Sequence, residues 1–331
     1  MSSNSSSDEV DAYSNKINQR LGKAIDHLKQ LKDVQRFYSD RSDKSYRALT
    51  FIGNSLDKFD IDIYENDIDI RLFDAEFVQV LSKLLLYLYE IRHDLDFDVV
   101  IDLDLSDRPR DLNEKRIFTL NYVILISHEL ECNSLELCTQ FVLKQGLKAL
   151  LSFLDDDTFL KQNQCFLGDG DFSEFVDSAA INLFNMRFTC DELRHVWVDL
   201  NAVNVLAKIG RIKDSSKFIS YATLLYVADD LQIETLKDIF LLAELLLAHL
   251  LKAKHRFEKN NVKRAWKKIN FKGKLVAYQT LHINVGNSFK LSVVYILDCL
   301  YKLACNPKVK SKMYFMNEMK SCLRTIFYEG K

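Results

Sequence analysis

The fold is predicted from the stretch Leu120–Leu154, LNYVILISHELECNSLELCTQFVLKQGLKALLSFL. Its apolar residues recur every three or four positions, which is the spacing of one helical face. The polar junction around Cys132 ends a long helix, and Asn133 can cap the shorter helix that follows. Gly146 can supply a sharp bend before a third helix that ends near Leu154. The stretch therefore predicts three helices that pack as one triangular unit.

The same skeleton recurs 173 residues further on, where Cys305 takes the place of Cys132. The second junction reads Lys302-Leu303-Ala304-Cys305-Asn306-Pro307, and a proline is tolerated in a first helical turn. A shift of this size divides into four units of about 43 residues, within the range of known helical repeats. The recurrence predicts that the chain is a stack of such repeats.

The composition agrees with a helical stack. The 331 residues include only 9 Gly and 2 Pro, so the chain has few signals for turns or strand ends. Apolar residues make up 48% and charged residues 28%, enough for a buried core and a solvated face. A chain of this length is either two domains or one elongated repeat array, and the composition favours the array.

Helical spacing predicts about fifteen helices in an all-α chain. The first begins near Asp11, after a Ser-rich tail over residues 1–10 that is predicted to be disordered. Residues 94–110 alternate acidic and apolar side chains and are interpreted as an acidic loop or insertion, with a short strand as the alternative. The remaining helices are expected over residues 42–56, 73–91, 113–131, 134–144, 146–154, 172–185, 191–209, 215–228, 233–255, 260–269, 275–283, 289–304, 309–316 and 319–327.

The stretch Leu120–Leu154 resembles an armadillo repeat, and Tyr295–Phe327 resembles another. The resemblance implies an armadillo/HEAT-like right-handed α-solenoid over residues 11–331. Because the chain stops after the second helix of its last unit, we expect the repeat domain to be incomplete there, with either further sequence after Lys331 or a partner covering this end. A weaker resemblance links the chain to the helical regions that precede TIR domains in invertebrate signalling proteins.

In peptide-carrying armadillo proteins, a Trp-x-x-x-Asn pair on the third helix of each repeat binds an extended peptide backbone. Leu125 and Glu129 stand at the matching positions here, so the peptide ladder is absent from this unit. Trp197 and Asn201 do have the required spacing on another helix. They are either a partner-binding pair or ordinary core residues.

Charge is unevenly distributed, although the formal net charge is only −2. Residues 57–107 hold fifteen acidic and four basic side chains, whereas residues 252–274 hold ten basic side chains and one acidic. The basic run is either a solvated helix face or a dock for an acidic protein, an anionic lipid or a nucleic acid. Its candidate partner-binding residues are Arg256, Lys263, Arg264, Trp266, Lys267 and Lys268.

Motifs for catalysis are missing from the sequence. There is no glycine-rich phosphate loop, nucleophile elbow or dinucleotide fingerprint. His128 and Cys132 lie four residues apart and can offer two metal ligands, but the other two ligands of a metal site are not evident, and core packing is the alternative. We therefore expect no enzymatic activity, no cofactor and no metal.

The sequence has no secretory signal, and its seven cysteines have no disulfide-framework spacing, which favours a cytoplasmic location. Together these features predict a non-catalytic protein–protein interaction scaffold or adaptor whose partner is a protein, with an acidic protein as one alternative. The alternative is the regulatory helical region of a larger TIR-type signalling protein, with its catalytic or effector domain elsewhere. Binding of nucleic acid or anionic lipid through the basic run is a third reading.

Overall fold

The computed structural model divides the chain into two compact units, Met1–Leu200 and Asn201–Lys331. In the first unit and the start of the second, it describes residues 5–31, 33–39, 43–57, 68–97, 109–163, 171–212 and 214–228. Further along, it describes residues 265–271, 274–280, 282–285, 289–292, 299, 301–303 and 305.

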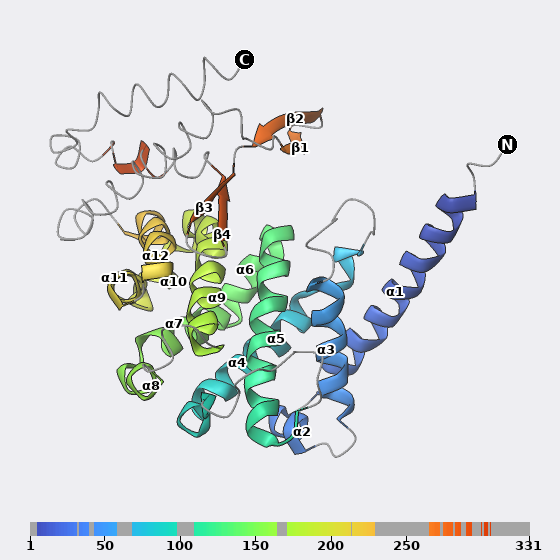
Figure 1. The fold of residues 1–331 in the computed structure, drawn as a ribbon, viewed down its shortest axis with the longest axis horizontal. Coiled ribbons are helices and arrows are strands. Elements are labelled where there is room, and N and C mark those ends of the chain that lie inside the picture. The colour runs from blue at the N-terminus through green and yellow to red at the C-terminus, as the bar shows by residue number, and fades with distance from the viewer. Residues whose placement is uncertain are drawn as a thin grey trace. The chain divides into compact units, whose positions relative to one another are not determined.

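Helices dominate the described residues, and two small pairs of strands follow them in the chain (Figure 1). The α-helices of the first unit are α1 (Ser5–Lys29), α2 (Val34–Ser39), α3 (Lys44–Asp57), α4 (Ala75–Glu90), α5 (Leu112–Asn133), α6 (Leu135–Leu143), α7 (Gly146–Asp155), α8 (Asp157–Gln162), α9 (Asp171–Met186) and α10 (Cys190–Asp199). Short 3-10 turns are η1 (Ile70–Leu72), η2 (Arg92–Asp94) and η5 (Arg187–Thr189). The second unit contains α11 (Ala202–Ile212), α12 (Asp214–Val227) and the strands β1 (Ala265–Phe271), β2 (Lys274–Thr280), β3 (His282–Val285) and β4 (Phe289–Ser292).

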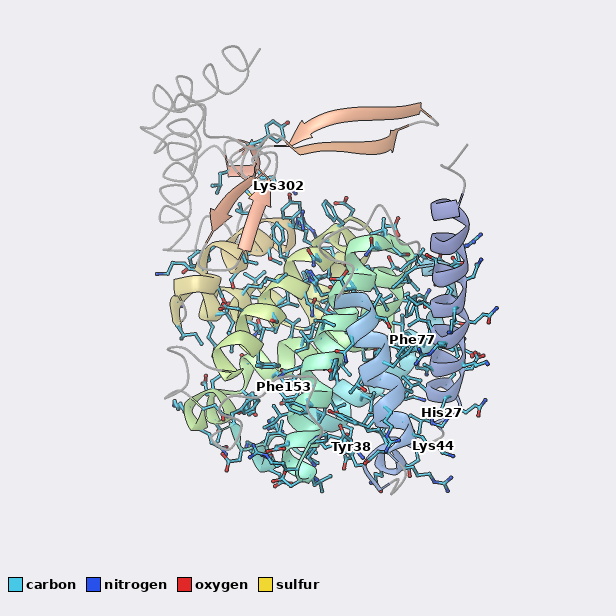
Figure 2. The ribbon with its side chains drawn as sticks, turned by 45° about the vertical axis from the view of Figure 1, so that its right-hand side comes forward. His27, Tyr38, Lys44, Phe77, Phe153 and Lys302 are labelled. Atoms are coloured by element: carbon cyan, nitrogen blue, oxygen red, sulfur yellow. The ribbon has the colours of Figure 1, made fainter. Side chains whose placement is uncertain are left out.

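Helix α5 lies in the middle of the first unit, where it packs against α3, α4, α6 and α9. Helix α1 packs against α3 and α4, and α7 packs against α4 and α9. Aromatic side chains fill the space around α7. The ring centroid of Phe153, which is labelled in Figure 2, lies 5.5 Å from those of Phe159 and Phe175. Burying each such ring contributes roughly 1.5–3 kcal/mol. The predicted all-α class therefore holds for the described part of this unit.

The contact between α3 and α5 is unusually close at Gly53. A Cβ atom on Gly53 would lie only 2.3 Å from Cδ1 of Tyr122, whose side chain is buried. The Tyr122 hydroxyl donates a hydrogen bond to Asn54 Oδ1 at 3.0 Å. At the start of α3, the buried Lys115 ammonium donates to Asp43 Oδ1 at 2.7 Å. Helix α3 is thus held on α5 at both ends.

The helix junctions within the stretch Leu120–Leu154 differ in detail from the sequence prediction. Asn133 is the last residue of α5 and its Nδ2 donates to Glu129 O, so its predicted capping role is wrong. Ser134 caps α6 instead, with its hydroxyl accepting from Leu137 N at 3.2 Å. At the next bend, Gln145 adopts the left-handed conformation with φ 73°, and Gly146 opens α7. Gly146 is required there because a Cβ would lie 2.4 Å from the Phe141 ring.

The single helix predicted over residues 191–209 is broken into α10 and α11. Asn201 lies between them with φ 57°, a conformation that asparagine tolerates better than most residues. The short helices α2 and α8 are absent from the prediction because six residues cannot show a helical period. At the N-terminus α1 already begins at Ser5, within the segment predicted to be disordered. Residues 98–108 of the expected acidic loop lie outside the described residues.

The strands of the second unit correct the helices predicted over residues 260–269 and 275–283 and the first part of the helix predicted over 289–304, whose described residues 299 and 301–303 are helical. β1 pairs with β2 in antiparallel register from Ala265 opposite Thr280 to Phe271 opposite Lys274, and β3 pairs with β4 in the same way. Only Lys272 and Gly273 connect β1 to β2, and a two-residue connection ending in glycine is typical of a hairpin. The prediction was wrong because it counted apolar spacing and passed over this local turn signal.

A partly buried ion pair joins η2 to the start of α8. The Arg92 guanidinium donates to Asp156, which also caps α8 by accepting from Phe159 N at 2.9 Å. Burial alone would raise the pKa of Asp156, but the hydrogen bond from Phe159 and the pairing with Arg92 outweigh it and lower the pKa. Asp156 therefore stabilises the fold above its unfolded-state pKa, and this contribution is lost as the pH falls through the folded-state pKa.

We expect Asp156→Asn, which keeps a capping side chain, to lower the free energy of unfolding by about 1 kcal/mol at neutral pH. Asp156→Ala, which removes the cap as well, is expected to cost about 1 kcal/mol more. Urea unfolding at a series of pH values checks both variants. The deficit of the Asn variant should shrink as the pH falls below about 5, because protonation of Asp156 weakens the same pair in the parent chain. A deficit independent of pH would contradict a role for the charge.

Candidate functional site

Trp197 and Asn201 do not form a pair on one helix face. Trp197 is fully buried in α10, and its indole N–H donates to Thr189 Oγ1 at 3.0 Å. Asn201 is exposed beyond the end of α10, and its Oδ1 accepts from Asn204 Nδ2. Because Trp197 has neither exposed surface nor a spare donor, the structure favours the interpretation of Trp197 as a core residue.

The other residues singled out in the sequence are placed only in part. Arg256, Lys263 and Arg264 lie outside the described residues. The backbones of Trp266, Lys267 and Lys268 belong to β1, where Trp266 pairs with Gln279 and Lys268 with Ala277, but their side chains are not described. The electrostatic dock expected over this run stays a prediction.

The proposed metal ligand His128 has a different partner. Its Nδ1 lies 2.9 Å from Asn185 Nδ2 on α9, so this ring edge serves the contact between α5 and α9. The side chain of Cys132 is outside the described residues. Within the part of the chain that the structure describes, no three His, Cys, Asp or Glu side chains gather closely enough to hold a metal ion.

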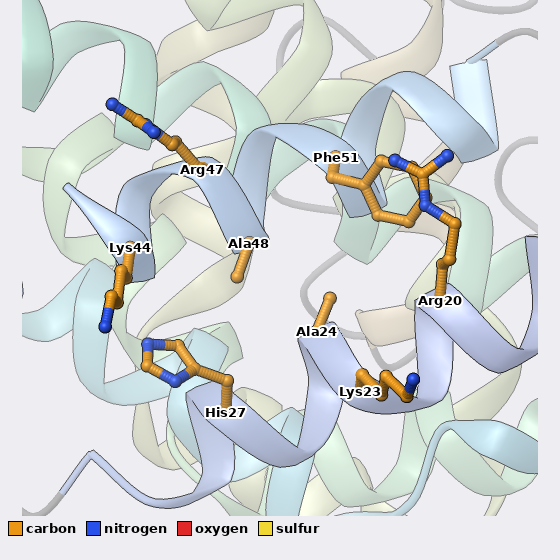
Figure 3. Close-up of a pocket in the computed structure, with 8 residues that line it drawn as sticks. All are labelled: Arg20, Lys23, Ala24, His27, Lys44, Arg47, Ala48 and Phe51. Atoms are coloured by element: carbon orange, nitrogen blue, oxygen red, sulfur yellow. The ribbon is translucent and has the colours of Figure 1, made fainter. Parts of the chain in front are cut away.

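A groove between α1 and α3 is the strongest candidate site in the described residues. It has a volume of about 360 Å³ and is lined by Arg20, Lys23, Ala24, His27, Lys44, Arg47, Ala48 and Phe51 (Figure 3). On each helix the four lining residues stand at positions i, i+3, i+4 and i+7, which is one face of a helix. Both faces carry the same order: two cations, an alanine and a ring.

The two helices run antiparallel, which arranges these residues symmetrically. The Arg20 guanidinium lies 4.7 Å from the Phe51 ring centroid at one end of the groove. At the other end His27 Nε2 lies 3.2 Å from Ser45 Oγ, beside Lys44 (Figures 2 and 3). Ala24 and Ala48 occupy the middle (Figure 3). Each ring therefore lies beside the first cation of the opposite helix, over a floor of small residues.

The pairing follows from the apolar faces of the two helices. On α1, Leu21, Ile25 and Leu28 are buried, and on α3, Leu49 and Ile52 are buried. These faces turn towards the core of the first unit, so that the flanking positions remain at the surface. Arg20, Lys23, Lys44 and Arg47 are all exposed, while the alanines and rings between them are half-buried.

The groove is strongly cationic because no carboxylate of the described residues lines it. Neighbouring acids are paired with other cations: Asp43 with Lys115 at 2.7 Å and Asp74 with Lys29 at 2.5 Å. Lys29 is thus neutralised on α1, whereas the four cations of the groove have no carboxylate partner among the described residues. An anionic group entering the groove would meet two Arg and two Lys side chains without displacing an existing ion pair.

Comparison with protein-family models, with curated protein sequences and with solved structures gives no match. No family is therefore assigned to the chain. Every described helix is too short or too polar to span a lipid bilayer.

The sequence prediction missed this groove because it looked for a continuous basic run. The repeated order of cation, cation, alanine and ring is visible at residues 20–27 and 44–51. However, each helix alone carries only two cations on this face, which is ordinary for a solvated helix. Only the pairing of α1 with α3 concentrates the charge.

Proposed function

We propose that the chain is a non-catalytic interaction scaffold that binds an acidic segment of a partner protein in the groove between α1 and α3. The observation that supports it is the set of four exposed cations on either side of an apolar floor, none of which has a carboxylate partner among the described residues. Such an arrangement attracts carboxylates over a long range, and the floor adds contact area at short range. The acidic partner considered from the sequence for the basic run is here proposed for a different surface, on the N-terminal helices.

The proposal includes an armadillo/HEAT-like solenoid as the scaffold. Helices α1, α3, α5 and α9 each pack against the next in this order. A second layer is formed by α4, which packs against α1 and α5, and by α7, which packs against α4 and α9. Stacking of neighbours along the chain is the property that repeat proteins use to present extended surfaces. The three-helix unit of α5, α6 and α7 is the part of this architecture that the sequence motif supports.

The binding proposal is tested on the full chain with a fluorescein-labelled peptide of alternating Glu and Ser, read by fluorescence anisotropy. The four changes Arg20→Gln, Lys23→Gln, Lys44→Gln and Arg47→Gln together are expected to weaken binding at least about tenfold at low salt. The affinity of the parent chain should fall as salt is added, because exposed ion pairs are screened.

A variant of equal charge change is the matched control. It carries Arg36→Gln, Lys83→Gln, Lys148→Gln and Lys161→Gln, which are exposed cations outside the groove. It is expected to lose less affinity than the groove variant at low salt and to match the parent within about twofold at about 0.15 M salt, where the Debye length is about 8 Å and charges outside the groove are screened. Equal losses in the two variants, or equal binding of a Gln-Ser peptide, would show that the groove has no specific role.

A further inference from the structure

We propose that the occupant of the α1–α3 groove is a partner α-helix that carries two acidic residues two turns apart with a bulky apolar residue between them. The inference rests on the proposed function and deepens it by naming the conformation and pattern of the acidic segment. It is carried by three features of the groove, namely its two cationic ends, its small central residues and the kinds of hydrogen-bonding groups it offers.

The cations and rings divide into two ends. Arg20 and Phe51 mark one end, and His27 and Lys44 mark the other (Figure 3). Arg20 and His27 are seven residues apart on α1, so the two ends are separated by about 10 Å along the helix axis. Residues seven apart on a partner helix span the same distance and lie on one face. Acidic residues at i and i+7 would therefore reach both ends at once.

The middle of the groove suits an apolar side chain. Ala24 and Ala48 face each other across it (Figure 3), and both are half-buried rather than exposed. Small residues at a helix contact let the axes approach closely, because interaxial distance depends on the side chains between them. A Leu at i+4 of the partner helix would lie between its two acids, over these alanines.

The hydrogen-bonding groups of the groove favour a helix over an extended peptide. The lining side chains are two Arg, two Lys, His27, two Ala and Phe51, and the Nε2 of His27 already lies beside Ser45 Oγ. Among the described residues, the lining therefore has no Asn or Gln side chain to accept hydrogen bonds from an extended backbone. An extended peptide would leave its N–H groups facing cations, whereas a helix pairs its backbone groups internally.

The test uses three capped, fluorescein-labelled peptides based on alanine, each with the same composition and net charge. The first has Glu at i and i+7 with Leu at i+4. The second moves the later Glu to i+5, which places the two acids on different faces. All three peptides contain one proline, which stands outside the helical segment in the first two. The third keeps the first pattern of Glu and Leu, but its proline has exchanged places with an alanine inside the helix, so that the helix breaks. Anisotropy with the full chain gives the three affinities.

We expect the first peptide to bind at least about fivefold more tightly than the other two, from two exposed ion pairs and one apolar contact. The advantage should disappear in the Arg20→Gln and Lys44→Gln double variant, which removes one cation from each end. It should survive in the Lys83→Gln and Lys148→Gln double variant, whose changes lie outside the groove.

A second measurement tests the central contact. Ala24→Gln together with Ala48→Gln should weaken binding of the Leu-containing peptide by several fold but barely affect a version with Ala in place of Leu. Such coupling requires contact between the peptide leucine and the alanines, and a general structural disturbance would weaken both peptides. Unfolding curves of the variants check that the first unit stays folded.

The outcomes separate this inference from the proposed function. If the three peptides bound the parent chain equally and none bound the variant with all four groove cations changed to Gln, the helical occupant would be overturned. The proposal of an acidic segment would still stand. Peptide binding that is unchanged in the groove variant would overturn both. Groove-dependent binding to phosphatidylserine vesicles that exceeds peptide binding would also overturn the inference, because the groove would then serve a membrane surface.

Discussion

Replacing Gly53 with alanine is expected to destabilise the first unit by about 3 kcal/mol, which is severe for a single methyl group. The new Cβ would lie 2.3 Å from Cδ1 of Tyr122, far inside van der Waals contact. The Tyr122 ring cannot easily move away, because it is buried and its hydroxyl is bonded to Asn54. Helix α3 would have to separate from α5, which would also displace one wall of the α1–α3 groove. Urea or thermal unfolding measures the loss.

Gly22 provides the matched control in the neighbouring helix. A Cβ on Gly22 would meet only Leu72 Cδ2 at 3.9 Å, an ordinary contact. Gly22→Ala is therefore expected to be neutral or stabilising by about 0.5–1 kcal/mol, because alanine favours the helix. Combining Gly53→Ala with Tyr122→Leu should recover part of the loss by making room. Similar unfolding curves for the two alanine variants would contradict the close α3–α5 contact.

Replacing Glu131 with methionine is expected to stabilise the chain by about 1–3 kcal/mol at neutral pH and above. Glu131 is buried in the last turn of α5, and neither carboxyl oxygen has a hydrogen-bond partner within the part of the chain that the structure describes. Burial raises the pKa of this carboxyl well above its usual range. The position at a helix C-terminus also opposes a negative charge. Methionine has a similar shape and removes the buried polar group.

The effect should depend on pH in a definite direction. Because its pKa is raised, Glu131 stays protonated in the folded chain at pH values where the unfolded chain has released the proton. Stability of the parent chain therefore falls as the pH rises above the unfolded-state pKa, until the folded-state pKa is passed. The advantage of Glu131→Met should grow over this interval, roughly from pH 5 upwards.

Two variants separate the charge from other effects. Glu131→Gln should remove the pH dependence but keep part of the cost, since an amide still has unpaired buried groups. Glu90→Met changes an exposed glutamate at the end of α4 and should alter stability by less than about 0.5 kcal/mol at any pH. A less stable Glu131→Met variant would show that the carboxyl has a partner whose loss matters.

Many helix positions in the first unit could be predicted from local sequence. Helices α4, α5, α6, α7 and α9 lie close to their predicted ranges because apolar spacing and capping residues act within a few positions. Asp74 and Asp111, for example, cap α4 and α5 by accepting from backbone amides of the first turn. Both are adjacent to the start of the apolar pattern, where a cap is expected.

Elements whose residues show no helical period could not be predicted from apolar spacing. The six-residue helices α2 and α8 are too short to show one, and the break at Asn201 depends on a single left-handed residue. Strand preference depends strongly on context, so the pairing of β1 with β2 could not be inferred from spacing alone. In that region the helical prediction was wrong.

By itself, the sequence determined where most helices of the first unit lie, because helical periodicity and caps are properties of neighbouring residues. The clustering of cations in the groove and the energetic cost of burying Glu131 were decided only by the tertiary structure. Arg20 and Lys44 are separated by a turn and a further helix, so their charges combine only after α1 packs against α3. Likewise, a glutamate is costly only where the packing of other helices removes its solvent, and that is decided by contacts distant in the chain.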